Sequence, residues 1–111
     1  MTFNIKKQPK MLYHSYKLEY KLPEHIKEKD IQWQGTVRGK RIWIYYDDKA
    51  THSDLSNHYA VFSNKGLIGW VQFGFTYPEI ENLIKSYKET DYDKGLEEFK
   101  KMIEESFYKG I

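Results

Sequence analysis

The sequence contains no cysteine and no long hydrophobic run. Without cysteine the chain can form neither a disulfide nor a cysteine-based zinc site, and a thiolate nucleophile is excluded, which favours a reducing compartment. Residues 1–7 lack the apolar stretch of a signal peptide, and no segment approaches the roughly 20 apolar residues of a membrane span. We therefore expect a cytoplasmic protein that has no membrane partner.

Arginine is scarce as well, because Arg38 and Arg41 are the only arginines among 18 basic residues. Bidentate arginine forks are the usual phosphate clamps, so their scarcity disfavours a surface dedicated to phosphate. Charge is also uneven: residues 1–45 carry ten Lys and Arg against four Asp and Glu, whereas residues 46–111 carry eight against twelve. Abundant Lys, Ile, Tyr and Asn indicate an AT-rich coding sequence, such as that of a low-GC bacterium or phage.

Aromatic side chains are abundant and make up 17% of the 111 residues. Aromatic rings bury large areas. We therefore expect one hydrophobic core, even though the hydrophobic fraction of 40% is somewhat low. We predict a single domain over residues 1–111, with residues 1–10 as a basic N-terminal arm that is free to be flexible.

Alternating apolar and polar residues predict four or five strands in the first two thirds of the chain. The first predicted strand runs from Met11 to Leu22 and ends before Pro23. Two hairpins follow, which pair residues 31–37 with 41–46 across a turn at 38–40, and residues 59–62 with 67–75 across a turn at 63–66.

The last third of the sequence predicts two amphipathic helices. Thr76 and Glu79 form a capping box at the start of the first helix, and residues 90–93 separate it from the second. Strands first and helices afterwards indicate an α+β fold, with an N-terminal antiparallel sheet and both helices packed on one face. The predicted apolar stripes are Ile80, Leu83, Ile84 and Tyr87 in the first helix, and Leu96, Phe99, Ile103 and Phe107 in the second.

Aromatic residues on the second face of the sheet form the predicted binding surface. Trp43 and Tyr45 share this face of the strand over residues 41–46, and Trp70 lies on the same face of a neighbouring strand. Rings turned away from the helices would form an interaction surface, with Arg38, Lys40 and Arg41 at its edge as steering charges. The alternative is that the sheet curls on itself, or pairs with a second copy, and buries these rings.

The predicted function is non-enzymatic binding of another protein through this face. Such a protein would resemble the small inhibitor, immunity or anti-defence proteins of mobile elements, and a homodimer is compatible with it. The alternative is a single-stranded nucleic-acid-binding protein that uses the same face, because cations beside exposed aromatics can hold single strands. A net charge of +2 disfavours strong non-specific affinity, and no motif requires a cofactor.

A metal-dependent hydrolase is the third hypothesis. His52, Asp54 and His58 follow Asp47-Asp48 within a dozen residues, and these ligand types could converge on Zn, Mn or Fe. Their spacing matches no specific motif, so solvated loop residues are the simpler explanation, and no catalytic residue is assigned.

Overall fold

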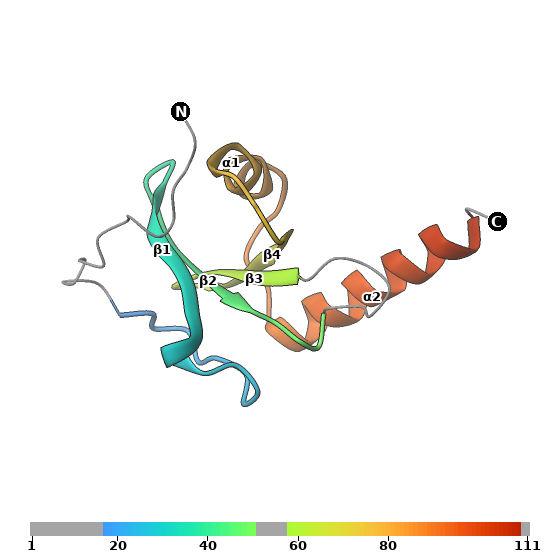
Figure 1. The fold of residues 1–111 in the computed structure, drawn as a ribbon, viewed down its shortest axis with the longest axis horizontal. Coiled ribbons are helices and arrows are strands. Elements are labelled where there is room, and N and C mark those ends of the chain that lie inside the picture. Colours follow the sequence, from blue (N-terminus) through green and yellow to red (C-terminus); the bar gives the residue numbers. More distant parts are fainter. Residues whose placement is uncertain (1–16, 51–57, 110–111) are drawn as a thin grey trace.

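In the computed structural model, residues 17–50 and 58–109 are described, with side chains up to residue 104. Figure 1 shows a sheet between two helices, with the later turns of the second helix extending beyond the strands. The predicted α+β fold, with an antiparallel sheet before two helices, is confirmed. The elements are the 3-10 turn η2 (Glu28–Asp30), the strands β1 (Ile31–Val37), β2 (Lys40–Tyr46), β3 (His58–Ser63) and β4 (Gly66–Gln72) in the sheet order β1-β2-β3-β4, and the helices α1 (Tyr77–Ser86) and α2 (Tyr92–Lys109).

Both predicted hairpins form, and the conformation of their turns explains the residues found there. Arg38 and Gly39 have φ angles of 51° and 76°, which a two-residue turn needs to match the twist of the strands. Gly66 has a φ of 145°, and a Cβ atom there would lie 2.7 Å from the carbonyl oxygen of Thr90. The second turn therefore requires glycine for both backbone and space.

The first predicted strand is not part of the sheet over the residues that can be compared. Residues 11–16 lie outside the described part of the chain, and residues 17–22 form no strand. The predicted alternation is nevertheless present as burial, since Leu18, Tyr20 and Leu22 are partly buried against the sheet and the residues between them are exposed. Period two here records which side chains face the core, without a hydrogen-bond ladder.

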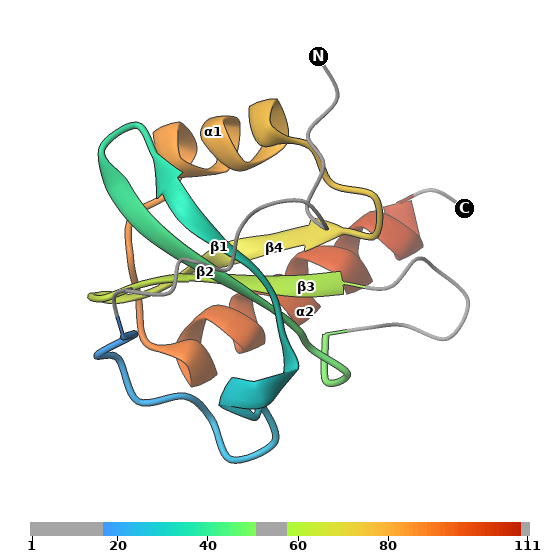
Figure 2. The ribbon, with the colours of Figure 1, turned by 60° about the vertical axis from the view of Figure 1, so that its left-hand side comes forward.

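The core is divided between the two faces of the sheet. Successive strand residues point to opposite faces, and β2 contributes Ile44 to one apolar cluster but Trp43 and Tyr45 to the other. Helix α1 packs against the first cluster, whereas α2 and residues 18–26 pack against the second. Figure 2 shows α1 and α2 on different sides of the sheet. The predicted packing of both helices on one face is not confirmed, because β2 is apolar on both faces and each face has its own cover.

The helix starts follow the local sequence. Glu79 accepts hydrogen bonds from the backbone N–H and the hydroxyl of Thr76, at 2.8 and 3.0 Å, so the predicted capping box is present. At the start of α2, Asp91 Oδ2 accepts the backbone N–H groups of Asp93 and Lys94. Neither α1 nor the described length of α2 is long and apolar enough to cross a membrane.

Candidate functional site

The predicted aromatic face is covered by other parts of the chain. Trp43 and Tyr45 are only 3% and 2% exposed, and they pack in the cluster that includes residues 18–26 and α2. Burial, together with the negative charge of Glu28, raises the pKa of Tyr45 to about 12. A partner could reach these rings only by displacing their cover. The rings are buried, as in the alternative prediction, but residues 18–26 and α2 bury them, and not a curled sheet or a second copy.

The predicted steering cations lie at the β1–β2 hairpin, and two of them contact acids of the same chain. Arg38 Nη1 lies 3.4 Å from a carboxylate oxygen of Glu81 on α1, an exposed contact that contributes little to stability. Lys40 Nζ donates to Glu89 Oε2 at 2.8 Å and ties the hairpin to the α1–α2 connection. Arg41 is exposed. A partner-binding role for these cations stays a prediction.

The carboxylate of Glu89 is stabilised by hydrogen bonds from Lys40 and Ser63. Its Oε2 atom accepts a hydrogen bond from Ser63 Oγ at 2.6 Å in addition to the one from Lys40. Burial by itself would raise the pKa of Glu89, but these two hydrogen bonds and the charge of Lys40 outweigh it and lower the pKa to about 2. Glu89 therefore remains an anion that fastens the end of β3 and the start of β2.

The predicted metal ligands are only partly described. His52 and Asp54 lie outside the described residues, whereas His58 is buried at the start of β3. Its ring meets the edge of Phe99 on α2 at a centroid distance of 5.2 Å. Burial lowers the pKa of His58, although the charge of Asp47 and a hydrogen bond with the Ala50 backbone oppose this effect. The packing and charge state of His58 thus resemble those of a core residue.

Asp47, which follows β2, is the centre of a buried polar network that the sequence does not reveal. Its side chain is 0% exposed, so its charge requires hydrogen-bond donors. Most of these groups come from segments far apart in the sequence, and the fold brings them together around one carboxylate. They are the Lys49 backbone N–H at 3.1 Å and His25 Nε2 at 2.9 Å on Oδ1, and Trp70 Nε1 at 2.9 Å and the Tyr92 hydroxyl at 2.6 Å on Oδ2.

Tyr92 and His25 complete this site. The Tyr92 hydroxyl also lies 3.1 Å from His25 Nε2. Burial, followed by the hydrogen bond and charge of Asp47, raises the pKa of Tyr92 far above its usual range, so the hydroxyl stays protonated. A hollow of about 470 Å³ lies beside the two side chains. A ring nitrogen of His25 and carboxylate oxygens of Asp47 and Asp48 lie within 4.8 Å of one another, a set that can hold a metal ion.

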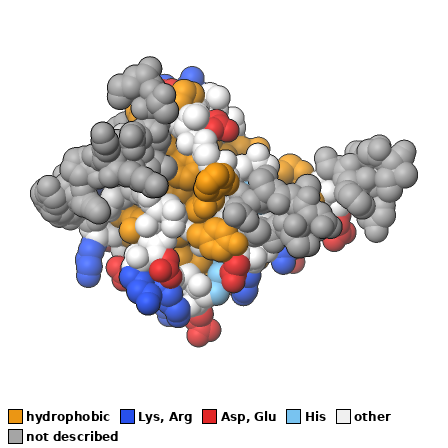
Figure 3. Space-filling view, in the orientation of Figure 1, with side chains coloured by type: hydrophobic (Ala, Val, Ile, Leu, Met, Phe, Trp, Pro, Cys, Tyr) orange, Lys and Arg blue, Asp and Glu red, His pale blue; other side chains and the backbone are white. Residues whose placement is uncertain are grey.

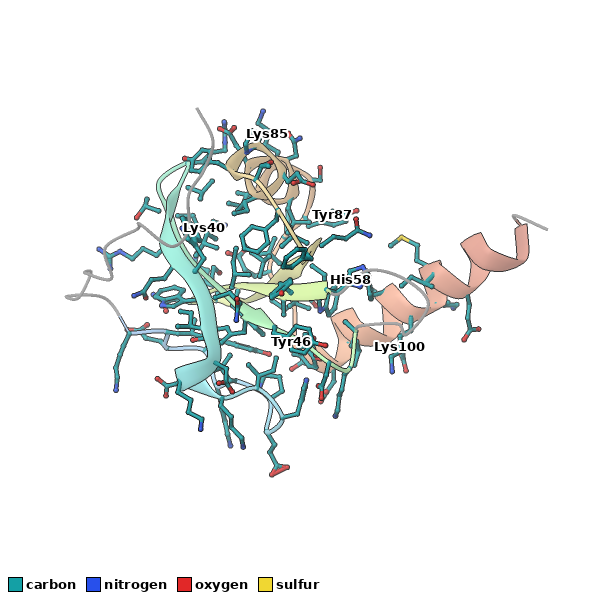
Figure 4. All side chains as sticks on the ribbon, viewed as in Figure 1. Lys40, Tyr46, His58, Lys85, Tyr87 and Lys100 are labelled. Atoms are coloured by element: carbon teal, nitrogen blue, oxygen red, sulfur yellow. The ribbon has the colours of Figure 1, made fainter. Side chains whose placement is uncertain are left out.

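A second feature is an open apolar groove at the outer edge of β4, between α1 and α2. Its volume is about 310 Å³, and the stacked rings of Trp70 and Phe99, 4.5 Å apart, form part of its wall. Tyr87 and Met102 border it and are 54% and 55% exposed. Figure 4 labels Tyr87 at the end of α1 and Lys100 on α2, the two helices that flank the groove. The other lining residues are Leu67, Ile68, Gly69, Leu83, Lys88, Thr90, Gly95 and Glu98.

Of the three aromatic residues that were predicted to form the binding surface, Trp43, Tyr45 and Trp70, only Trp70 lines this groove. Sequence analysis placed Tyr87 in the apolar stripe of α1 but assigned no exposure to it, and it did not single out Met102. Figure 3 shows further hydrophobic side chains exposed over the sheet. Tyr46 is the last residue of β2 and Phe73 follows β4; they are 37% and 73% exposed and do not line the groove.

The molecule thus presents a polar site around Asp47 and an apolar groove beside β4, and Trp70 contributes to both. Its indole nitrogen contacts Asp47, while its ring lines the groove. The functional assignment depends on this geometry, since no family model, no curated protein and no solved structure matches the chain.

Proposed function

We propose that this chain is a non-enzymatic binding module that recognises another protein through the groove beside β4. The observation that supports this most directly is the exposure of Tyr87 and Met102, 54% and 55%, on the border of an apolar hollow. Large apolar and aromatic side chains around a concave surface are common anchors of protein interfaces. The groove would accept apolar side chains of the partner between α1 and α2.

The charges around the groove favour a protein over a nucleic acid. Lys88 and Glu98 both line it, so it offers one charge of each sign instead of a basic track for a phosphate backbone. The rings that were predicted to stack with bases, Trp43 and Tyr45, are buried. A protein partner with mixed charges around an apolar anchor fits this surface better than a single strand does.

Binding without chemistry is also how small inhibitor, immunity and anti-defence proteins act, since they occupy a surface of their target. Our proposal therefore includes this class. The protein would be encoded by a low-GC bacterium or its phage and would act in the bacterial cytoplasm. Its steering charges remain those of the hairpin, because Arg38 and Arg41 are exposed and the ion pair between Arg38 and Glu81 lies at the surface. The groove replaces the face of Trp43 as the surface that carries the affinity.

The proposal is tested by capture from host-cell lysate, with and without nuclease treatment, followed by binding measurements with the purified partner. The groove variant is Tyr87→Ser/Met102→Ser, and the matched control is Tyr46→Ser/Phe73→Ser, which changes two exposed apolar residues outside the groove. We expect the groove variant to bind the partner at least about tenfold more weakly, whereas the control keeps its affinity.

Two outcomes would contradict this proposal. One is a partner whose affinity falls with the control variant and not with the groove variant. The other is recovery of nucleic acid alone, with binding that weakens steeply as salt is added, which would favour the nucleic-acid alternative. Circular dichroism of both variants shows whether the fold is retained.

A further inference from the structure

We infer that His25, Asp47 and Asp48 form a binding site for one divalent transition-metal ion, with Zn²⁺ as the best match. The potential ligand atoms are one imidazole nitrogen and one oxygen of each carboxylate, and all lie within 4.8 Å of one another. Imidazole and carboxylate together are ligands that Zn²⁺ accepts readily, whereas Mg²⁺ and Ca²⁺ prefer oxygen alone. This site is separate from the groove, and the inference does not depend on the proposed function.

His25 Nε2 and Asp47 Oδ1 face one another at 2.9 Å, so the ion would lie between these two atoms. The Lys49 N–H contacts the same oxygen, whereas Trp70 Nε1 and the Tyr92 hydroxyl contact Oδ2. Either a proton shared between His25 and Asp47 or a cation bound to both can occupy this position. A small shift would place each ligand about 2.0–2.2 Å from a zinc ion.

The same donors would hold the carboxylate in place for the metal. Ligating carboxylates in metal sites are themselves hydrogen-bonded, and these outer contacts tune affinity. Trp70 is held by its contacts with Phe99 and Tyr92, so its indole N–H is aimed at Asp47 by the packing of β4 against α2. A divalent cation would also compensate the charge of Asp47, which is 0% exposed.

The third ligand and the route of entry are on the solvent side. Asp48 is exposed, and the His25 side chain is 17% exposed. The hollow of about 470 Å³ beside His25 and Tyr92 gives a hydrated ion access and leaves room for water as the remaining ligand. Bound metal would connect the segment before η2 to the end of β2 and stabilise the folded chain.

The experiment is titration of the full chain with ZnCl₂ by calorimetry, together with metal analysis after dialysis. We expect one Zn²⁺ per wild-type chain, and affinity that is lower by about tenfold or more in Asp48→Asn and in His25→Gln. Glutamine keeps an N–H group that can reach Asp47 but lacks the imidazole ligand. The matched control is Asp93→Asn, an exposed acid of the same hollow, which should bind like wild type.

An independent readout is the NMR signal of the His25 ring, which should shift on addition of one equivalent of Zn²⁺. The inference is overturned if wild type binds no Zn²⁺ at millimolar concentration, or if all variants bind equally, which would mean an adventitious ion only. Asp48 is exposed, so Asp48→Asn should fold and decides the question even if His25→Gln does not.

Discussion

The Tyr92 hydroxyl donates a hydrogen bond of 2.6 Å to Asp47 Oδ2 and thereby joins the first turn of α2 to the end of β2. The backbone N–H of Tyr92 donates a hydrogen bond to the Tyr20 hydroxyl at 2.9 Å, so the same residue also contacts the segment of residues 18–26 that covers the sheet. Tyr92 is 3% exposed and its ring stacks on Phe62 of the sheet. Helix α2 is therefore attached to the face that carries Trp43 by polar as well as apolar contacts.

Replacing Tyr92 by Phe should destabilise the protein by about 1.5–3 kcal/mol, because the buried Asp47 carboxylate loses a donor. Urea unfolding followed by circular dichroism measures this loss. Tyr59→Phe is the matched control, since Tyr59 is also buried and makes ring contacts with Tyr46 and Phe75. Equal losses for the two variants would show that the hydrogen bond to Asp47 contributes little.

Trp43→Ala should lower the free energy of unfolding by about 3–5 kcal/mol, the range for large aromatic residues removed from a core. Trp43 is 3% exposed, whereas Tyr87 is 54% exposed. Tyr87→Ala should therefore change stability by no more than about 0.5 kcal/mol. If Trp43→Ala kept full stability and instead abolished partner binding, the aromatic face would be the binding surface after all.

His58 should make the protein less stable at mildly acidic pH. Burial lowers its pKa below the usual 6.5, despite the opposing effects of Asp47 and Ala50. As the pH falls below 6.5 the unfolded chain takes up this proton before the folded chain does, so the stabilisation present above 6.5 decreases. We expect His58→Gln to reduce the slope of unfolding free energy against pH in this range. An unchanged slope would assign the dependence to other groups.

Glu89 should contribute a separate loss of stability in strong acid. Its folded pKa of about 2 lies below the usual 4.5, so the contribution is complete above 4.5 and disappears as the pH falls toward 2. Glu89→Gln should remove this part of the acid transition and lower stability at neutral pH. Lys40→Met provides the comparison, because it removes the cation and leaves Glu89 to titrate at higher pH. An identical acid transition in wild type and Glu89→Gln would contradict the assignment.

The elements that could be predicted from the sequence are those determined by interactions between residues a few positions apart. The turn at Arg38-Gly39 has the positive φ angles of a two-residue turn, and the capping box of Thr76 and Glu79 joins residues three apart. Period two also identified correctly which of residues 17–22 face the core. It could not distinguish a strand from an extended cover, because both bury alternate side chains.

The candidate sites depended on contacts that no local pattern records. Asp47-Asp48 was recognised as a pair of potential ligands, but its partner is His25, 22 residues before Asp47. The groove needed Trp70 of β4 beside Phe99 of α2 and Tyr87 at the end of α1. Trp70 and the Asp47-Asp48 pair had been singled out, but nothing in the sequence marks His25, Tyr87 or Phe99 as their neighbours in a site.

The sequence by itself determined the α+β class, the two hairpins and the two helices, because hydrophobic period, turn residues and caps act over a few residues. Only the tertiary structure decided which face of the sheet each helix covers. With Ile44 on one face and Trp43 and Tyr45 on the other, β2 requires cover on both sides. Which segment covers which face depends on long-range contacts such as that of Tyr92 with Asp47. As a result the face of Trp43 is buried, and the groove beside β4 is open instead.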